Sequence, residues 1–146
     1  MSDYLEALIF DRTQSDIIEM SSKAYIDYND LNRIERSIKW VSYVLNQYGY
    51  KNITHSKLDW KPEDRRTDSE MERLRENIVA IRNAYYTDNS TPLTPEKITY
   101  TSIYQANAIE KIIFDLGTLI EKSYPGPQFL EFRLGMKTIG NRGIKI

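Results

Sequence analysis

A row of apolar residues at helical spacing constrains this chain more than any other feature of its sequence. The apolar side chains recur at alternating steps of three and four residues, at Leu31, Ile34, Ile38, Val41, Leu45 and Tyr48. This spacing places them on one face of a helix and resembles a coiled-coil seam. Asp30 opens the predicted helix, and Gly49 occupies the usual stop position. Trp40, Tyr43 and Val44 widen the stripe, which favours a bundle over a two-stranded coil.

Two further long helices follow along the chain. The first of them is predicted from the apolar row Met71, Leu74, Ile78, Ile81 and Tyr85. It starts after a capping box from Thr67 to Glu70. The next begins near Thr101 or Ser102, and its apolar positions are Ile109, Ile112, Ile113, Leu116, Leu119 and Ile120. Gly117 inside this helix costs about 1 kcal/mol relative to alanine, so we expect a partner backbone to pass close to it.

The N-terminal region is predicted to hold one short helix. It runs from about Gln14 to Lys23, with Thr13 as N-cap and Asp16 in the first turn, where its charge favours the helix dipole. The apolar stretch 5–10 is too short to assign to a class.

The connections between the long helices lack a regular pattern. Residues 50–66 are predicted to cross the bundle irregularly, with Ile53, Leu58 and Trp60 pinning the crossing to it. Residues 87–96 contain Asn, Ser and two Pro and are predicted to form a loop.

The pattern changes period after Tyr124-Pro125-Gly126-Pro127, which ends the last helix. Apolar residues then alternate with polar or small ones, at Leu130, Phe132, Leu134 and Met136. A period of two is typical of a half-buried strand, and a single strand must pair with another to satisfy its backbone. We therefore predict that a partner is bound by Phe129, Leu130, Phe132, Arg133, Leu134, Met136 and Lys137.

The predicted strand of the tail could pair with either of two partners. It either folds back on its own bundle, where only residues 5–10 offer a pairing segment, or it augments another subunit's sheet. Arg133, Lys137, Arg142 and Lys145 against Glu131 give it a charge of +3. The Pro-Gly-Pro break and these basic residues favour the second partner.

The length of 146 residues allows one hydrophobic core. The patterns predict a mainly α fold, with a small bundle of three long helices plus a short N-terminal helix over residues 1–124. An extended strand tail occupies 125–146.

Composition excludes several classes of function. The net charge of -1 argues against a dedicated nucleic-acid binder. The chain has no cysteine and only one histidine, which excludes disulfide scaffolds, thiolate or multi-histidine metal sites and cysteine nucleophiles. The start carries Asp3 and Glu6 and no basic segment, so it is no secretory signal, and no apolar run reaches the ~18 residues of a membrane span. We expect synthesis in the cytoplasm.

No pattern of catalytic, cofactor-binding or metal-ligating residues emerges. His55 and Asp59 could form a base and its orienting group, but no nucleophile is near them in the sequence. The acidic residues between 63 and 72 could hold a metal, yet acids in a first helical turn beside arginines are better explained by surface pairing. We predict no cofactor, no small-molecule substrate and no enzymatic activity.

A weak internal echo links two of the long helices. Asn32-x-Ile34-Glu35 recurs 75 residues on as Asn107-x-Ile109-Glu110. Each asparagine lies near a helix start, where its amide could bond a loop backbone and fix a turn; a polar site between two helices is the alternative. Two copies make no repeat architecture, and common helix-forming preferences explain the similarity as well.

Several stretches resemble small proteins encoded among the tail and baseplate genes of phages and prophages of Gram-positive, clostridia-like bacteria. The stretches are Phe10-Asp11-Arg12-Thr13-Gln14-Ser15-Asp16, Asp30-Leu31-Asn32-Arg33-Ile34-Glu35, Trp60 with Glu63-Asp64 and Thr67, Met71-Glu72-Arg73, and Ala106-Asn107-Ala108-Ile109-Glu110-Lys111. The resemblance lies in their order and spacing over most of residues 10–120.

This resemblance implies a non-enzymatic virion or tail-like-particle component near the baseplate or tail fibres. Its partners would be other tail and baseplate proteins in a symmetric ring, with no nucleic acid and no membrane among them. Relatives often carry a longer C-terminal region, so the short tail suits an adaptor better than a fibre. The alternative is a small helical regulatory or assembly-chaperone protein, which the helix seams support equally well.

Overall fold

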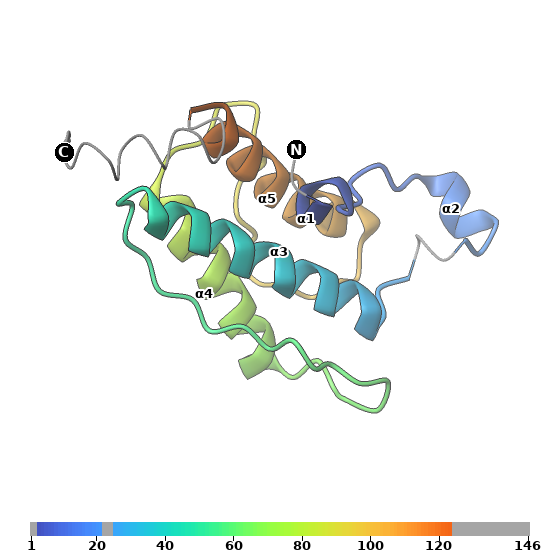
Figure 1. Ribbon diagram of the computed structural model, residues 1–146. Helices are drawn as coiled ribbons and strands as arrows, with labels where there is room; N and C mark the ends of the chain where they lie inside the picture. The colour runs from blue at the N-terminus through green and yellow to red at the C-terminus, as the bar shows by residue number, and fades with distance from the viewer. Residues whose placement is uncertain (1–2, 22–24, 124–146) are drawn as a thin grey trace.

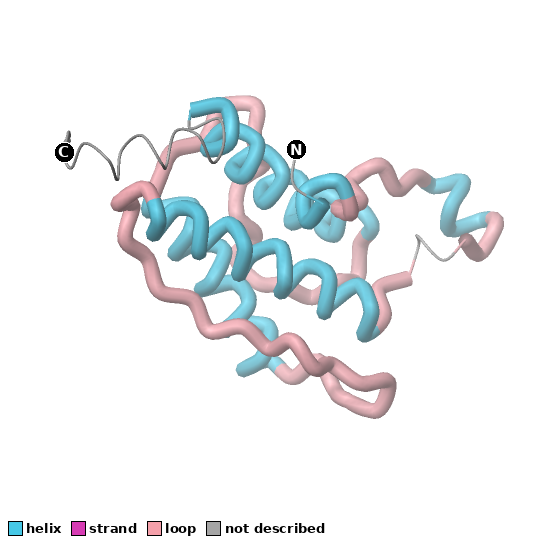
Figure 2. Tube along the Cα trace, in the orientation of Figure 1, coloured by secondary structure: helices cyan, strands magenta, loops and turns pink. Residues whose placement is uncertain are grey.

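The computed structural model describes residues 3–21 and 25–123, and the ordered elements within those ranges are five helices (Figure 1). They are α1 (Asp3–Glu6), α2 (Gln14–Ile18), α3 (Tyr28–Gln47), α4 (Asp68–Ala84) and α5 (Ile103–Ser123). In this part of the chain all connections are loops and no strand occurs (Figure 2). The prediction of a mainly α fold with three long helices is confirmed. The predicted tail strand and its binding residues 129–137 lie outside the described residues.

Helix α3 is the centre of the packing, because it contacts α4, α5 and α1, and α1 also contacts α5 (Figure 1). Most apolar residues of the three predicted rows are buried, namely Leu31, Ile34, Ile38, Val41, Leu45, Met71, Leu74, Ile78, Ile81, Ile109, Ile112, Ile113, Leu116 and Ile120. Tyr48 and Tyr85 are half-buried against this core, and Leu119 is half-buried. Each of the buried residues contributes about 1.5–3 kcal/mol by leaving water. The helical rows predicted from the sequence therefore form the core.

Side chains cap the N-termini of α3 and α4, with one correction to the prediction at each of these helices. The N-cap of α3 is Asp27, not Asp30; Asp30 N donates to Asp27 Oδ1 at 3.0 Å, and Asp27 N donates back to Asp30 Oδ2 at 3.0 Å. The predicted stop at Gly49 is confirmed by its φ of 91°. At α4, Thr67 Oγ1 accepts from Glu70 N at 3.2 Å, but the Glu70 carboxylate pairs with Arg73 instead of closing the box.

Three predicted core contacts are wrong. Tyr43 is mostly exposed on α3, and Ile53 and Leu58 are exposed on the 50–66 crossing. Of the three residues predicted to pin the crossing, only Trp60 is buried. Polar groups hold this segment by its backbone, as shown below, so its apolar side chains are free to face solvent.

The short N-terminal helix ends earlier than predicted. Met20 adopts a left-handed backbone, with φ 55°, so α2 stops at Ile18 and does not extend toward Lys23, which lies outside the described residues. Met20 N donates to Ile17 O, and Ser21 N donates to Asp16 O. These are the bonds of a Schellman motif, in which glycine ordinarily takes the place of Met20.

Gly117 has a close neighbour, but it is a side chain rather than the backbone we expected. A Cβ at position 117 would lie 2.6 Å from Leu5 Cδ2, and Leu5 is buried on α1. The glycine therefore makes the space in which α1 seats its one buried leucine against α5.

We expect Gly117→Ala to lower the free energy of unfolding when Leu5 is present and to raise it when Leu5 is replaced by alanine. In the native background the added methyl overpacks the contact and lowers the free energy of unfolding by about 1 kcal/mol. In a Leu5→Ala background, which itself loses about 2–5 kcal/mol, the same change should stabilise by about 1 kcal/mol through helix propensity. Urea unfolding of the four proteins measures both effects; equal effects of Gly117→Ala in the two backgrounds would contradict the packing described.

Candidate functional site

Two glutamates lie in the middle of the core, where carboxylates are rarely found. Glu35 on α3 and Glu110 on α5 have no exposed surface. A buried carboxylate is tolerated only when several donors satisfy it. The donors around these two side chains show what the structure uses them for.

Glu110 binds one extended segment and one arginine of α3. Its Oε1 accepts from Ile9 N at 2.8 Å and from Arg33 Nε at 3.3 Å. Its Oε2 accepts from Arg12 Nη2 at 2.7 Å and from Arg33 Nη2 at 2.9 Å. The segment around residues 9–12 is thereby fixed against α5, next to Arg33 of α3.

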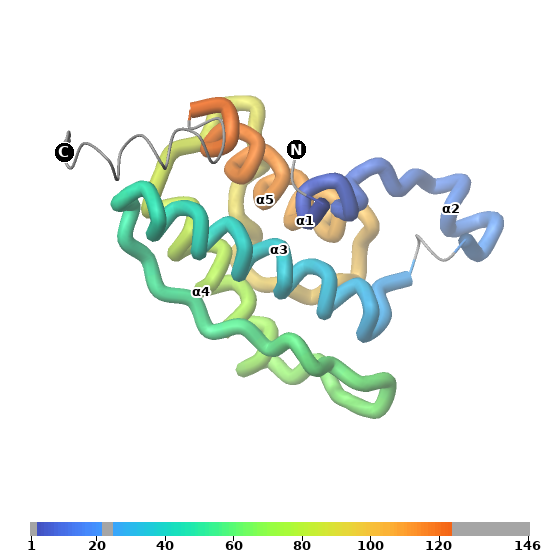
Figure 3. The backbone as a smooth tube through the Cα atoms, viewed as in Figure 1, coloured from blue at the N-terminus to red at the C-terminus, as the bar shows by residue number. Residues whose placement is uncertain are grey.

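Glu35 repeats this arrangement with one extended segment and one arginine of α4. Its Oε1 accepts from Lys57 N at 3.1 Å and from Arg73 Nη1 at 2.9 Å. Its Oε2 accepts from Trp60 Nε1 at 2.9 Å and from Arg73 Nη2 at 2.6 Å. The backbone of residues 50–60 runs along α3 in the opposite direction (Figure 3).

The two asparagines of the echo bind the backbone of one residue each. Asn107 Oδ1 accepts from Arg12 N at 3.1 Å, and its Nδ2 donates to Arg12 O at 3.0 Å. Asn32 Oδ1 accepts from Trp60 N at 2.8 Å, and its Nδ2 donates to Trp60 O at 3.1 Å. The interpretation that each amide bonds a loop backbone is confirmed.

The echo is therefore a structural duplication rather than a common helix preference. Residues 9–16 dock on α5 as residues 57–64 dock on α3. Each segment also ends in the same turn: Thr13 N donates to Asp16 Oδ2 at 2.8 Å, and Lys61 N donates to Asp64 Oδ2 at 2.9 Å. The sequence carried a signal for this in Asp11-Arg12-x-x-x-Asp16 and Asp59-Trp60-x-x-x-Asp64.

The electrostatics of both clusters favour the charged form of their arginines. Hydrogen bonding to Glu35 raises the pKa of Arg73. For Arg33, burial disfavours the charged form, but Glu110 and Asp30 together outweigh burial and the pKa is raised. Each carboxylate accepts four hydrogen bonds, so its lone pairs are occupied and both clusters act as fasteners of the chain.

The candidate catalytic residues are not brought together. Asp59 Oδ1 accepts from Lys57 Nζ at 3.3 Å, and the backbone N–H and carbonyl of exposed His55 bond to Asn77. Of the acidic run, Glu72 pairs with Arg75 within α4. Within the described ranges, no three acidic or histidine side chains gather in a way that could hold a metal ion.

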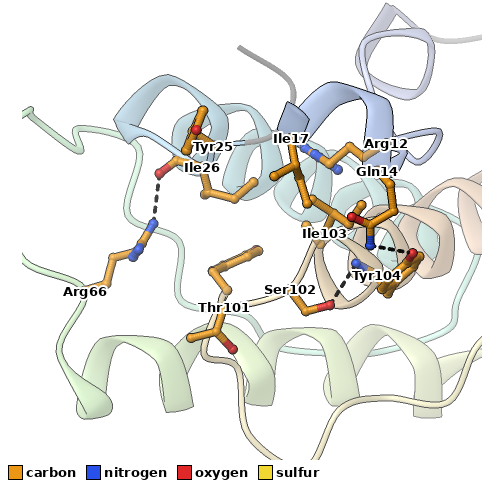
Figure 4. A pocket seen from close by; sticks show the side chains of 12 residues that line it. Arg12, Gln14, Ile17, Tyr25, Ile26, Arg66, Thr101, Ser102, Ile103 and Tyr104 are labelled. Carbon is orange, nitrogen blue, oxygen red and sulfur yellow. Dashed lines mark hydrogen bonds between the residues drawn. The ribbon is translucent and has the colours of Figure 1, made fainter. Parts of the chain in front are cut away.

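Exposed apolar side chains follow the first docked segment along the chain. We call residues 13–21 the arm; it contains α2, which buries none of its residues and projects from the bundle (Figure 1). Ile17 is 40%, Ile18 79% and Met20 74% exposed. Ile17, Tyr25 and Tyr104 border a cavity of about 470 Å³ between the arm and the start of α5 (Figure 4).

In comparisons with known proteins, no family model, curated protein or solved structure matches the chain. None of the helices in residues 3–21 and 25–123 is both long and apolar enough to cross a membrane.

The duplication allows a matched test of the two asparagines. Asn32→Asp and Asn107→Asp each remove the donor to a carbonyl and set a carboxylate oxygen against it. Arg12 Nη1 lies 3.2 Å from Asn107 Oδ1 and compensates there. We expect Asn32→Asp to lower the free energy of unfolding by about 2 kcal/mol, and Asn107→Asp by at least about 1 kcal/mol less.

Urea unfolding at several pH values measures the difference. Below pH ~4 the carboxyl introduced by Asn32→Asp is protonated and donates to the carbonyl again, so the deficit of this variant against the native protein should shrink as the pH falls. Equal losses of unfolding free energy in the two variants would contradict the compensating role of Arg12. A deficit of Asn32→Asp that grows as the pH falls would contradict the assigned hydrogen bond to the carbonyl.

Proposed function

We propose that this chain is a non-enzymatic structural component of a phage tail or tail-like particle. It would act as an adaptor in the baseplate or tail-fibre region, made in the cytoplasm and then incorporated into the particle. The resemblance over residues 10–120 supports this assignment, and so does the use of its buried charges. Arg12, Glu35 and Glu110 all hold the chain in register and are not offered to a substrate.

The observation that carries the proposal is the exposed apolar arm, which projects from a helical bundle held together by buried ion pairs. Isolated apolar side chains on a surface need no explanation, but Ile17, Ile18 and Met20 lie within four residues of one another, and Tyr25 and Tyr104 border the same cavity. Aromatic and aliphatic side chains around a hollow are typical of a contact that another protein covers.

The C-terminal tail is the second contact of the proposed adaptor. Its alternating residues 130–136 would bind a neighbour, and helix faces would add area, because a stable interface buries about 1,600 Å² in total and one short segment gives only part of it. A symmetric ring would multiply such contacts into firm attachment.

The test is mass-spectrometric proteomics of density-purified particles from induced source cells. We expect this chain in a fixed ratio to other tail proteins. Deletion of residues 126–146 should leave the chain folded, by circular dichroism, and absent from the particles. A chain found in the lysate and missing from the particles would overturn the proposal and favour the regulatory or chaperone alternative.

A further inference from the structure

The duplication shows that the docked segment and its turn do not require an apolar arm. Residue 64 of the second docked segment corresponds to residue 16 of the first, because both carboxylates close the same turn. The positions that follow are charged in the second copy: Arg65, Arg66 and Asp68 stand where the arm has Ile17, Ile18 and Met20. Arg65 and Arg66 are exposed on the loop before α4, and Asp68 is exposed at its first position. The turn that Asp16 and Asp64 close therefore does not require apolar residues after it.

The arm also has a distinct charge. It contains Asp16 and Glu19 and no lysine or arginine between residues 13 and 21. Two copies joined arm to arm would bring like charges together. A partner that fits the arm must combine apolar residues with basic ones.

Residues 130–137 of this chain have that combination. Their apolar row, Leu130 to Met136, is interleaved with Arg133 and Lys137, and the tail as a whole has a charge of +3. Its one acidic residue, Glu131, is complementary in charge to Arg66, which lines the cavity beside the arm and donates to Ile26 O. Arg12 also lines this cavity, but its guanidinium is paired with the buried Glu110.

The tail of the same copy does not reach the arm with its whole apolar row. The cavity lies at the start of α5, and the tail leaves from Ser123 at the other end of this 21-residue helix, about 30 Å away. A fully extended chain spans at most about 25 Å from Ser123 to Leu130 but about 45 Å from Ser123 to Met136, so the tail of the same copy can bring only the later part of its row to the cavity. A neighbouring copy can bring the whole row.

We propose that the arm and its cavity receive residues 130–137 of a neighbouring copy of this chain. The inference rests on the proposed function and names the partner of its surface. The contact is made by side chains, since residues 3–21 and 25–123 hold no strand whose edge the tail could extend. It joins two different surfaces head to tail, and such contacts close into rings or continue as filaments.

Cysteine cross-linking of the full-length chain tests the contact, because the natural sequence has no cysteine. Ile18→Cys and Leu134→Cys are made as separate proteins, mixed and oxidised. We expect a covalent dimer that contains one of each. Ile53→Cys is the matched control, since Ile53 is 76% exposed but lies by Lys39, whose charge repels the tail. No mixed dimer, or as much dimer with Ile53→Cys, would overturn the proposal.

A second variant checks the same surface without cross-linking. Ile17 and Ile18 are exposed and α2 buries none of its residues, so helix content and thermal midpoint should not change in the double variant Ile17→Arg with Ile18→Arg. We expect the dissociation constant for self-association, measured by sedimentation, to rise about tenfold or more, against no change for Ile53→Arg. A wild-type chain that stays monomeric, or equal effects of the two variants, would contradict the inference.

The two proposals fail separately. A chain that is present in purified particles but forms no arm-to-tail dimer retains the proposed function and loses this contact. A chain that forms the dimer and is absent from the particles retains the contact and loses the proposed function.

Discussion

The buried carboxylates of Glu35 and Glu110 are the interaction on which the rest of this structure depends. Each draws an arginine from a neighbouring helix and the backbone of an extended segment to one point in the core. Helix packing alone would leave these segments unplaced, because they bury few apolar side chains. A charged anchor replaces the hydrophobic one that such a long connection would otherwise need.

Anchors of this kind fix position more than they add stability. Two buried charges recover through their pairing roughly what they lose by leaving water, but removal of one partner leaves the other uncompensated at about 3–5 kcal/mol. That is a large part of the ~5–15 kcal/mol that separates a folded domain from its unfolded chain. The segments at residues 9–16 and 57–64 are thus held in one register, because any other register would leave a buried charge without its partner.

The sequence predicted what depends on local periodicity. The rows through Ile38, Ile78 and Ile113 identify their helices because a buried face must recur every three or four residues. The hydrogen bonds of the Trp60 backbone could not be predicted from the sequence, because the partner asparagine lies 28 residues earlier and no local pattern links the two. The duplication was visible only in part. Its helices repeat after 75 residues and its docked segments after 48, because α4 and its loops lie between the second segment and α5.

The order of the two docked segments has a consequence for synthesis on the ribosome. Residues 57–64 dock on α3, which is already made when they emerge. The first segment docks on α5, and the bond from Ile9 to Glu110 spans 101 residues. The beginning of the chain, with its apolar arm, must therefore wait without its anchor until about three quarters of the protein has been translated, so the N-terminus is the last part of the described fold to be secured.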